Sequence, residues 1–277
     1  MSGTDTNDVI ERYREQIWED LRRVARPDSR FHWDFSRFIP DFEGSSACAD
    51  RVLALEAMAV LGERRIFIAP DNCLEQLRAQ LLRGGIGFVM TTYGIGRGFQ
   101  VIDPIVVPPA AVQAAATLDG FDRFARPISL AELRDGPAFG VCVTGGSAVS
   151  RNGVRFGKGH GYFDVEFAIL SDLGLAGSLT SVVDVVHDCQ YVDDDLMPEQ
   201  HDVTVNVIVT PTRTLLASSD PRLPARVRWE LVPGTEFETL GVLAELAELA
   251  EIQRRASPTF DASSPTSPSS PATEEQP

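Results

Sequence analysis

The sequence has almost no lysine and no long run of apolar residues. Lys158 is the one lysine, and all other basic side chains are arginines. No stretch reaches the ~18 consecutive apolar residues that suggest a membrane-spanning helix, so we expect no contact with a membrane. The first residues are polar and lack the apolar core of a signal peptide. This pattern predicts a cytoplasmic protein.

Paired cysteines and an excess of positive charge are also missing. The four cysteines lie far apart without a C-x-x-C pair, which argues against a disulfide framework or a structural zinc site. Acidic residues number 40 and basic residues 25, giving a net charge of −15. Proteins that bind nucleic acid through its phosphates carry an excess of lysine and arginine. The composition therefore predicts no nucleic-acid partner.

Short runs rich in valine and isoleucine alternate with helical patterns along the chain. The runs cover residues 65–70, 86–92, 101–107, 138–144, 181–187 and 203–210. Continuous apolar runs between helices are typical of strands buried on both faces of a sheet. We therefore expect an α/β fold with a mostly parallel sheet and helices on both faces.

The periodicity of apolar residues also predicts how the chain is divided. We expect a disordered start (1–8), an α/β domain (9–235), a C-terminal helix (236–255) and a disordered tail (256–277). Within the domain, helices are expected at about 9–25 and 45–61. The tail has 14 Ser, Thr or Pro among its 22 residues, too few apolar groups to offset its ordering entropy. The sequence leaves open whether the protein is a monomer or a homodimer.

A glycine-rich segment between a strand pattern and a helix pattern is the strongest functional signal. Gly157, Gly159 and Gly161 alternate, and Arg155 and Lys158 add positive charge. Glycines let a backbone approach a ligand closely, and successive amides in such a loop can converge on an anion. The following helix would direct its positive dipole end toward the same anion. The segment therefore indicates a phosphate site, although a plain strand-to-helix turn is also compatible with it.

The same segment carries a family resemblance. G-V-R-F-G-K-G-H-G-Y-F-D resembles the signature of 5-formyltetrahydrofolate cyclo-ligases, which are also called methenyltetrahydrofolate synthetases. The sequence is most similar to the methenyltetrahydrofolate synthetase domain-containing proteins of this family. Further matching segments are Arg14-Glu15-Gln16-Ile17-Trp18, Ile39-Pro40-Asp41-Phe42-Glu43-Gly44-Ser45, Gly146-Ser147-Ala148-Val149, Asp164-Val165-Glu166-Phe167-Ala168, Val186-His187-Asp188-Cys189-Gln190, Glu199-Gln200-His201-Asp202 and Val209-Thr210-Pro211-Thr212-Arg213. The resemblance runs from about residue 9 to residue 230.

The resemblance implies a fold related to ribose-phosphate isomerase and CoA-transferases, with ATP and Mg²⁺ as reactants and 5-formyltetrahydrofolate, a reduced folate, as substrate. In that reaction the formyl oxygen takes the γ-phosphoryl group of ATP. N10 of the folate then closes the ring, phosphate leaves, and 5,10-methenyltetrahydrofolate forms. Phosphorylation is needed because an amide oxygen is a poor leaving group.

The resemblance also implies roles for individual residues. Those matching the phosphate-binding loop are Gly157, Lys158, Gly159, His160 and Gly161. Arg155, Lys158 and Tyr162 are the expected catalytic residues, and Asp164 is the expected metal ligand. Two positions depart from active cyclo-ligases. Val165 stands where they normally have arginine, and their lysine near the N-terminus is missing. Arg12 or Arg14 could supply that charge, and we expect Arg14 to be the nucleotide-binding residue.

Other patterns leave alternatives open. His187-Asp188 and His201-Asp202 are compatible with a metal site, but loop-orienting hydrogen bonds fit them better. The aromatic stretch from Phe31 to Phe42 can stack a flat pteridine ring or simply fill the core. A second glycine-rich segment, 91–98, suits a surface loop or a lid. The two departures also admit a non-catalytic nucleotide- or folate-binding protein, or a ligase for a different formylated substrate.

Overall fold

A single large sheet forms the centre of the molecule. The computed structural model describes residues 3–28, 30–156, 161–221, 223 and 226–256. The strands follow the order β11 (Thr214–Leu216), β10 (Val207–Val209), β8 (Ser181–Val185), β5 (Phe139–Gly145), β1 (Arg65–Ile68), β2 (Phe88–Thr91), β3 (Phe99–Ile102) and β4 (Arg126–Pro127). The five central strands, from β10 to β2, run parallel, and antiparallel strands complete both edges. The expected α/β class with a mostly parallel sheet is confirmed.

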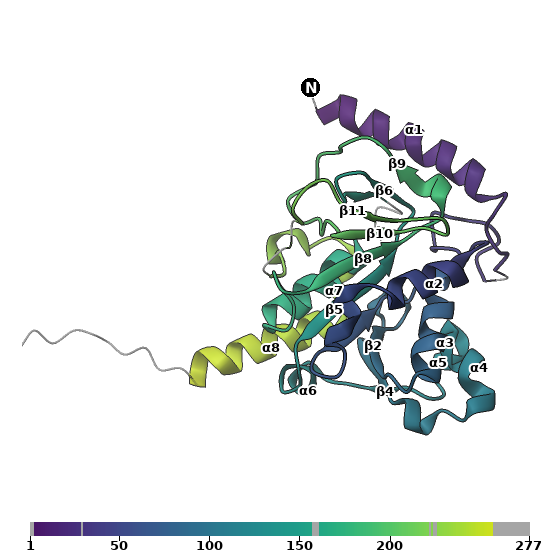
Figure 1. Cartoon of the computed structure of the whole chain (residues 1–277). Helices are drawn as coiled ribbons and strands as arrows, with labels where there is room; N and C mark the ends of the chain where they lie inside the picture. The colour runs from purple at the N-terminus through teal and green to yellow at the C-terminus, as the bar shows by residue number, and fades with distance from the viewer. Residues whose placement is uncertain (1–2, 29, 157–160, 222, 224–225, 257–277) are drawn as a thin grey trace, which may run out of the picture.

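Helices cover both faces of this sheet (Figure 1). One group consists of α2 (Ser45–Leu53), α3 (Glu75–Arg83), α4 (Val112–Ala116) and α5 (Leu118–Phe121). The other group consists of α6 (Leu130–Arg134), α7 (Tyr162–Asp172) and α8 (Gly241–Ala256). Short 3₁₀ helices occupy Glu56–Val60, Asn72–Leu74, Tyr93–Ile95, Pro104–Val106, Pro109–Ala111, Asp188–Gln190, Trp229–Leu231 and Glu236–Thr239. Because the helices shield both faces, every residue of β5 is buried, which explains its continuous apolar run.

A second, smaller sheet carries the N-terminal helix. Its strands lie in the order β7 (Arg155–Phe156), β6 (Ala148–Ser150) and β9 (Tyr191–Val192). Helix α1 (Gly3–Leu21) lies over this sheet (Figure 1), and Ile17 is buried there against Val154 and Phe156. This packing fixes α1 beside the strand that leads into the glycine-rich segment.

Several expected boundaries were wrong. Helix α1 begins at Gly3, so residues 3–8 are helical rather than disordered, and α2 ends at Leu53. The run 101–107 is not one strand, because β3 ends at Ile102 and Pro104, which lacks an amide hydrogen, opens a 3₁₀ helix. The run 203–210 is reduced to β10. The expected tail lies outside the described residues except for Ala256, the last residue of α8.

The order of the strands creates a crevice between β1 and β5. From β1 the chain crosses through α3 to β2 on one side, whereas from β5 it passes through α7 to β8 on the other side. At such a switch point the connections diverge, and ligands of α/β proteins bind beyond the carboxyl ends of the strands. The topology thus places the candidate site next to residues 69–72 and 144–147.

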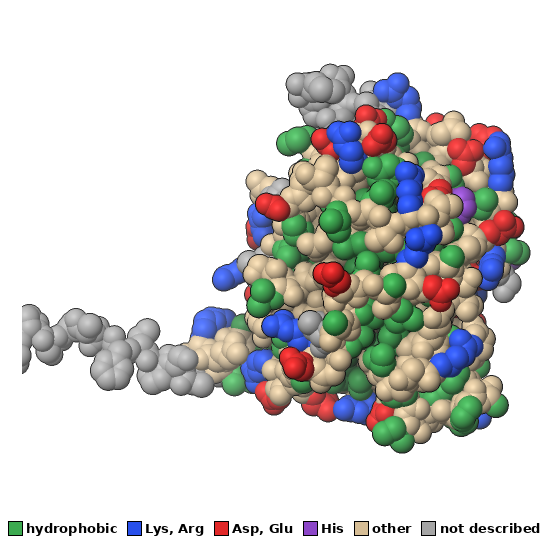
Figure 2. Space-filling model, viewed as in Figure 1, with side chains coloured by type: hydrophobic (Ala, Val, Ile, Leu, Met, Phe, Trp, Pro, Cys, Tyr) green, Lys and Arg blue, Asp and Glu red, His purple; other side chains and the backbone are tan. Residues whose placement is uncertain are grey.

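The surface carries side chains of both charges, as the composition of the sequence predicts. Acidic and basic side chains are interspersed on the face that Figure 2 shows. Among the described residues, no helix combines the length and the apolar character needed to cross a membrane.

Candidate functional site

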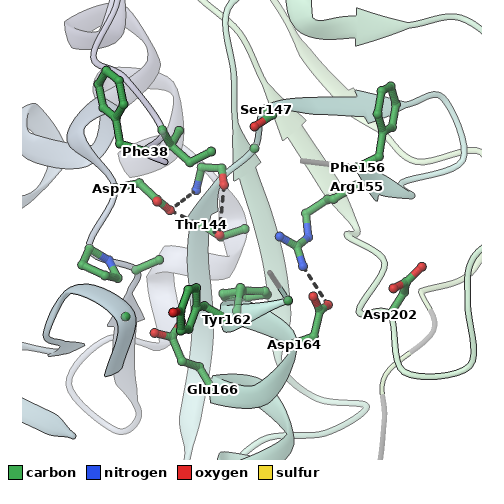
Figure 3. Close-up of a pocket in the computed structure, with 18 of the residues that line it drawn as sticks. Phe38, Asp71, Thr144, Ser147, Arg155, Phe156, Tyr162, Asp164, Glu166 and Asp202 are labelled. Carbon is green, nitrogen blue, oxygen red and sulfur yellow. Dashed lines mark hydrogen bonds and ion pairs between the residues drawn. The ribbon is translucent and has the colours of Figure 1, made fainter. Parts of the chain in front are cut away.

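A cavity of about 530 Å³ lies at this switch point. Its floor is formed by the segments that follow β1 and β5, and its walls come from α1, α7, the aromatic stretch and the loop that precedes β10. Segments from widely separated parts of the sequence therefore meet in one crevice (Figure 3).

Asp71 joins the two halves of the floor. Its Oδ2 accepts a hydrogen bond of 2.8 Å from the Gly145 amide, which links the end of β1 to the end of β5. Beneath it, the fully buried Arg78 donates to the carbonyl oxygens of Ala69 (3.1 Å) and Asp71 (3.0 Å). A Cβ on Gly145 would lie 2.6 Å from Cys73 Sγ, so only glycine fits here without displacing its neighbours. These contacts hold the floor in one conformation.

A buried carboxyl group lies directly below the floor. Asp184 of β8 has no exposed surface, and neither carboxylate oxygen has a hydrogen-bond partner of normal geometry among the described residues. A Cβ on Gly146 would be 2.6 Å from its Oδ2. Burial raises the pKa of Asp184 to about 7, and the positive charge of Arg155 opposes this shift only in part.

Arg155 and Asp164 form an ion pair on the wall formed by β7 and α7 (Figure 3). Arg155 Nη2 lies 2.8 Å from Asp164 Oδ1, which also accepts the Val203 amide at 2.8 Å. The guanidinium carbon lies 4.6 Å from the centre of the Phe163 ring. Burial raises the pKa of Asp164, whereas Arg155 and the Val203 amide favour its charged form. The structure thus places the expected basic residue and the expected metal ligand side by side on the cavity.

Gly161 and Tyr162 begin helix α7 at the edge of the cavity. Gly161 has a φ of 69°, in the left-handed region where glycine is favoured, and it caps the helix. The Tyr162 hydroxyl donates a 2.6 Å hydrogen bond to Glu236 Oε2, while its ring lines the cavity. Burial and this carboxylate raise the pKa of Tyr162 well above its usual value. The phenol is therefore a protonated donor that points toward Glu236.

Residues 157–160, and with them the expected Gly157, Lys158, Gly159 and His160, lie outside the described residues. The residues on either side of them, Phe156 and Gly161, both line the cavity. Arg14 of α1, the residue expected to supply the charge of the missing N-terminal lysine, lines the cavity as well.

An aromatic wall lines part of the cavity. Phe31 and Phe38 stack with their ring centres 4.7 Å apart, and Tyr93 lies 5.4 Å from Phe31. All three rings line the cavity. The aromatic stretch singled out in the sequence therefore contributes both to the core, through the buried Phe35 and Phe42, and to the site.

The two His-Asp pairs lie in different places. His201 and Asp202 line the cavity, with His201 Nε2 3.8 Å from Asp202 Oδ1. Asp188 instead accepts the hydroxyls of Thr210 and Thr212, both at 2.6 Å, and thereby fixes a turn. Within the described part of the chain, no three His, Cys, Asp or Glu side chains form a cluster that could hold a metal ion by themselves. The sequence hypothesis of a metal site built from both pairs is therefore wrong for these residues.

Sequence reasoning assigned no role to several site residues. Asp71 and the buried pair Thr91–Glu166, whose side chains are hydrogen-bonded to each other, were not singled out. A polar residue directly after a short apolar run was the available signal for Asp71, since such residues mark the carboxyl end of a parallel strand. The contact between Thr91 and Glu166 joins β2 to α7, and no local pattern predicts it.

Comparisons of the sequence with known proteins agree on one family. The model of the 5-formyltetrahydrofolate cyclo-ligase family matches residues 8–211. Methenyltetrahydrofolate synthase domain-containing proteins of Bos taurus and Homo sapiens are each 32% identical to this chain, and the matches cover 83% of it. The chain spans 59% of the length of these relatives. The NMR structure of Aquifex aeolicus 5,10-methenyltetrahydrofolate synthetase aligns with 78% of this chain and 96% of its own, at 14% identity and a TM-score of 0.45.

Proposed function

Because the chain belongs to the 5-formyltetrahydrofolate cyclo-ligase family, we propose that its crevice converts 5-formyltetrahydrofolate to 5,10-methenyltetrahydrofolate with ATP and Mg²⁺. The observation that carries the proposal is that cationic and aromatic side chains line one cavity. The cationic residues are Arg14 and Arg155, and the aromatic residues are Phe31, Phe38 and Tyr93. A nucleotide phosphate and a flat pteridine ring need these two kinds of surface.

The cationic residues would hold the phosphates of ATP. The segment 157–161 carries Lys158 and ends at the N-terminus of α7, where free backbone amides and the helix dipole favour an anion. With the pteridine ring against the aromatic wall, the formyl oxygen would face the γ-phosphoryl group. The protein contributes by holding both reactants in line and by excluding water. The γ-phosphoryl group passes from ATP to the formyl oxygen, and ADP is the leaving group. N10 then attacks the formyl carbon to form the new C–N bond and loses its proton, and the C–O bond breaks as phosphate leaves.

The residues of the site are compatible with a magnesium ion held jointly with ATP. Asp164 Oδ1 is occupied by Arg155 and Val203, but Oδ2 faces the Gly161 side of the site, 3.7 Å from where a Cβ would lie. Asp202 is close enough to raise the pKa of Asp164 through its charge. One or two carboxylates completed by phosphate oxygens and water form a typical Mg²⁺ site. When bound there, Mg²⁺ would neutralise the charge that develops on the transferred phosphoryl group.

One observation favours a second candidate, a family member that binds the nucleotide or folate without turnover. Val165, at the position where active cyclo-ligases normally have arginine, packs against the hydrophobic core. Helix α7 therefore supplies no cation from this position.

Turnover distinguishes the two candidates. We expect purified protein with ATP, Mg²⁺ and 5-formyltetrahydrofolate to produce the absorbance of the methenyl product together with an equal amount of phosphate. The control omits ATP, and a second control replaces the folate with its unformylated form. Binding of MgATP without product or phosphate would contradict the ligase and support the binding protein. A lack of MgATP binding would contradict both candidates.

A further inference from the structure

The segment 236–256 packs beside the site, although it lies beyond the residues that match the family model. That match ends at residue 211, whereas α8 ends at Ala256. Val242 and Leu243 of α8 are buried, and the Glu245 side chain accepts the Leu130 amide at 2.7 Å. A Cβ on Gly98, in the loop beside the aromatic wall, would lie 3.8 Å from Val242. The segment is therefore anchored on the domain by several contacts.

Two residues just before α8 contact the first residue of α7. Glu236 Oε2 accepts the Tyr162 hydroxyl at 2.6 Å, and the Phe237 ring packs edge-on against the Tyr162 ring, with 5.3 Å between centres and an angle of 85°. Across the cavity edge, the Tyr162 hydroxyl lies 3.4 Å from where a Cβ of Gly94 would be. Tyr162 is thus held between the C-terminal segment and the 93–95 turn.

We propose that Glu236 and Phe237 are positioning residues of the nucleotide site, which they complete by fixing Tyr162 and the start of helix α7. The inference rests on the proposed function in that it takes the ligand to be MgATP. Tyr162 directly follows Gly161, so its position sets where the first amides of α7 point. An anion bound to a helix N-terminus depends on these amides, and a displacement of 1 Å weakens such a contact strongly.

The chemistry of the contact explains why a carboxylate occupies position 236. A hydrogen bond from a neutral phenol to a charged carboxylate is roughly twice as strong as one between neutral groups. Because the Tyr162 proton is directed to Glu236, the hydroxyl acts through its position and its ring rather than as a proton donor to the substrate. This replaces the catalytic role expected for Tyr162 with a positioning role.

The test measures MgATP affinity by calorimetry in single variants. We expect Glu236→Ala to weaken binding about tenfold, the loss that corresponds to one charge-assisted hydrogen bond. Glu236→Gln keeps an acceptor oxygen and should remain within about threefold of the wild type. Glu248→Ala, on the exposed face of α8, is the matched control and should bind like the wild type. Thermal melting of each variant checks that it is folded.

A second arm tests whether the two side chains act together. Tyr162→Phe combined with Glu236→Ala should bind MgATP no more weakly than the weaker single variant, because both changes remove the same contact. Wild-type affinity in Glu236→Ala, or no recovery in Glu236→Gln, would overturn the proposal. These readouts use binding alone, so a failure of turnover contradicts the ligase function without deciding this inference.

Discussion

Replacing Arg155 by leucine is expected to lower the rate of methenyl product formation at least about 100-fold, since it removes a preorganised cation from the site. Among the described residues, the same change leaves the Val203 amide as the hydrogen-bond donor to Asp164 and therefore favours protonation of that carboxyl. Removing one partner of such a buried ion pair lowers the free energy of unfolding by about 3 kcal/mol or more. Urea unfolding and initial rates measured on the same preparation test both effects.

A double variant separates the structural role of the pair from its role in the reaction. Arg155→Leu with Asp164→Leu removes both charges, so most of the lost unfolding free energy should return. The rate should stay at the low level of the single variant, because the cation and the candidate metal ligand are both missing. Recovery of turnover together with stability would show that the pair merely supports the fold.

Asp184→Asn is expected to change how the stability of the protein depends on pH. The folded-state pKa of Asp184 is about 7, above the ordinary value of 3.8, because the carboxyl group is fully buried. Between these two values the folded protein holds a proton that the unfolded chain releases. The wild type therefore loses unfolding free energy as the pH rises from about 4 to about 7, and the loss stops above that range.

The variant lacks this titration. Between about pH 5 and the folded-state pKa, the wild type loses about 1.36 kcal/mol of unfolding free energy for each pH unit, and the variant does not. Relative to the wild type, Asp184→Asn should therefore gain about 3 kcal/mol of unfolding free energy between about pH 5 and pH 8. Asp220→Asn, an exposed aspartate, is the control and should follow the wild type. Parallel curves for wild type and Asp184→Asn, measured by urea unfolding, would show that Asp184 does not titrate in this range.

The sequence predicted those parts of the fold that depend on local patterns. The apolar runs at 65–70 and 138–144 became β1 and β5, because strands buried on both faces must be apolar throughout. The antiparallel pairing of β2 with β3 was not predicted, since the direction of pairing depends on the loop between them and on no periodicity. The helical start at Gly3 was missed because residues 3–8 carry few apolar side chains.

The site residues, too, divide into those that a local sequence pattern predicts and those that depend on contacts between distant parts of the chain. Arg155, Tyr162 and Asp164 line the cavity, and they were predicted because one short motif contains them. Arg14 lines it too, and it was predicted because the N-terminal lysine of active cyclo-ligases is missing. The hydroxyl partner of Tyr162 was missed because Glu236 lies 74 positions further along the chain. Asp71 and Asp184 act through contacts between strands, which the order of the strands creates.

The most direct test of the account is the affinity for MgATP of Lys158→Ala. Lys158 lies between Phe156 and Gly161, which both line the cavity, and it is the only lysine in the sequence. We expect the alanine variant to bind MgATP at least about tenfold more weakly with an unchanged melting temperature, and Lys158→Arg to stay within about threefold of the wild type. Wild-type affinity in Lys158→Ala would contradict the claim that this crevice holds the phosphates of a nucleotide.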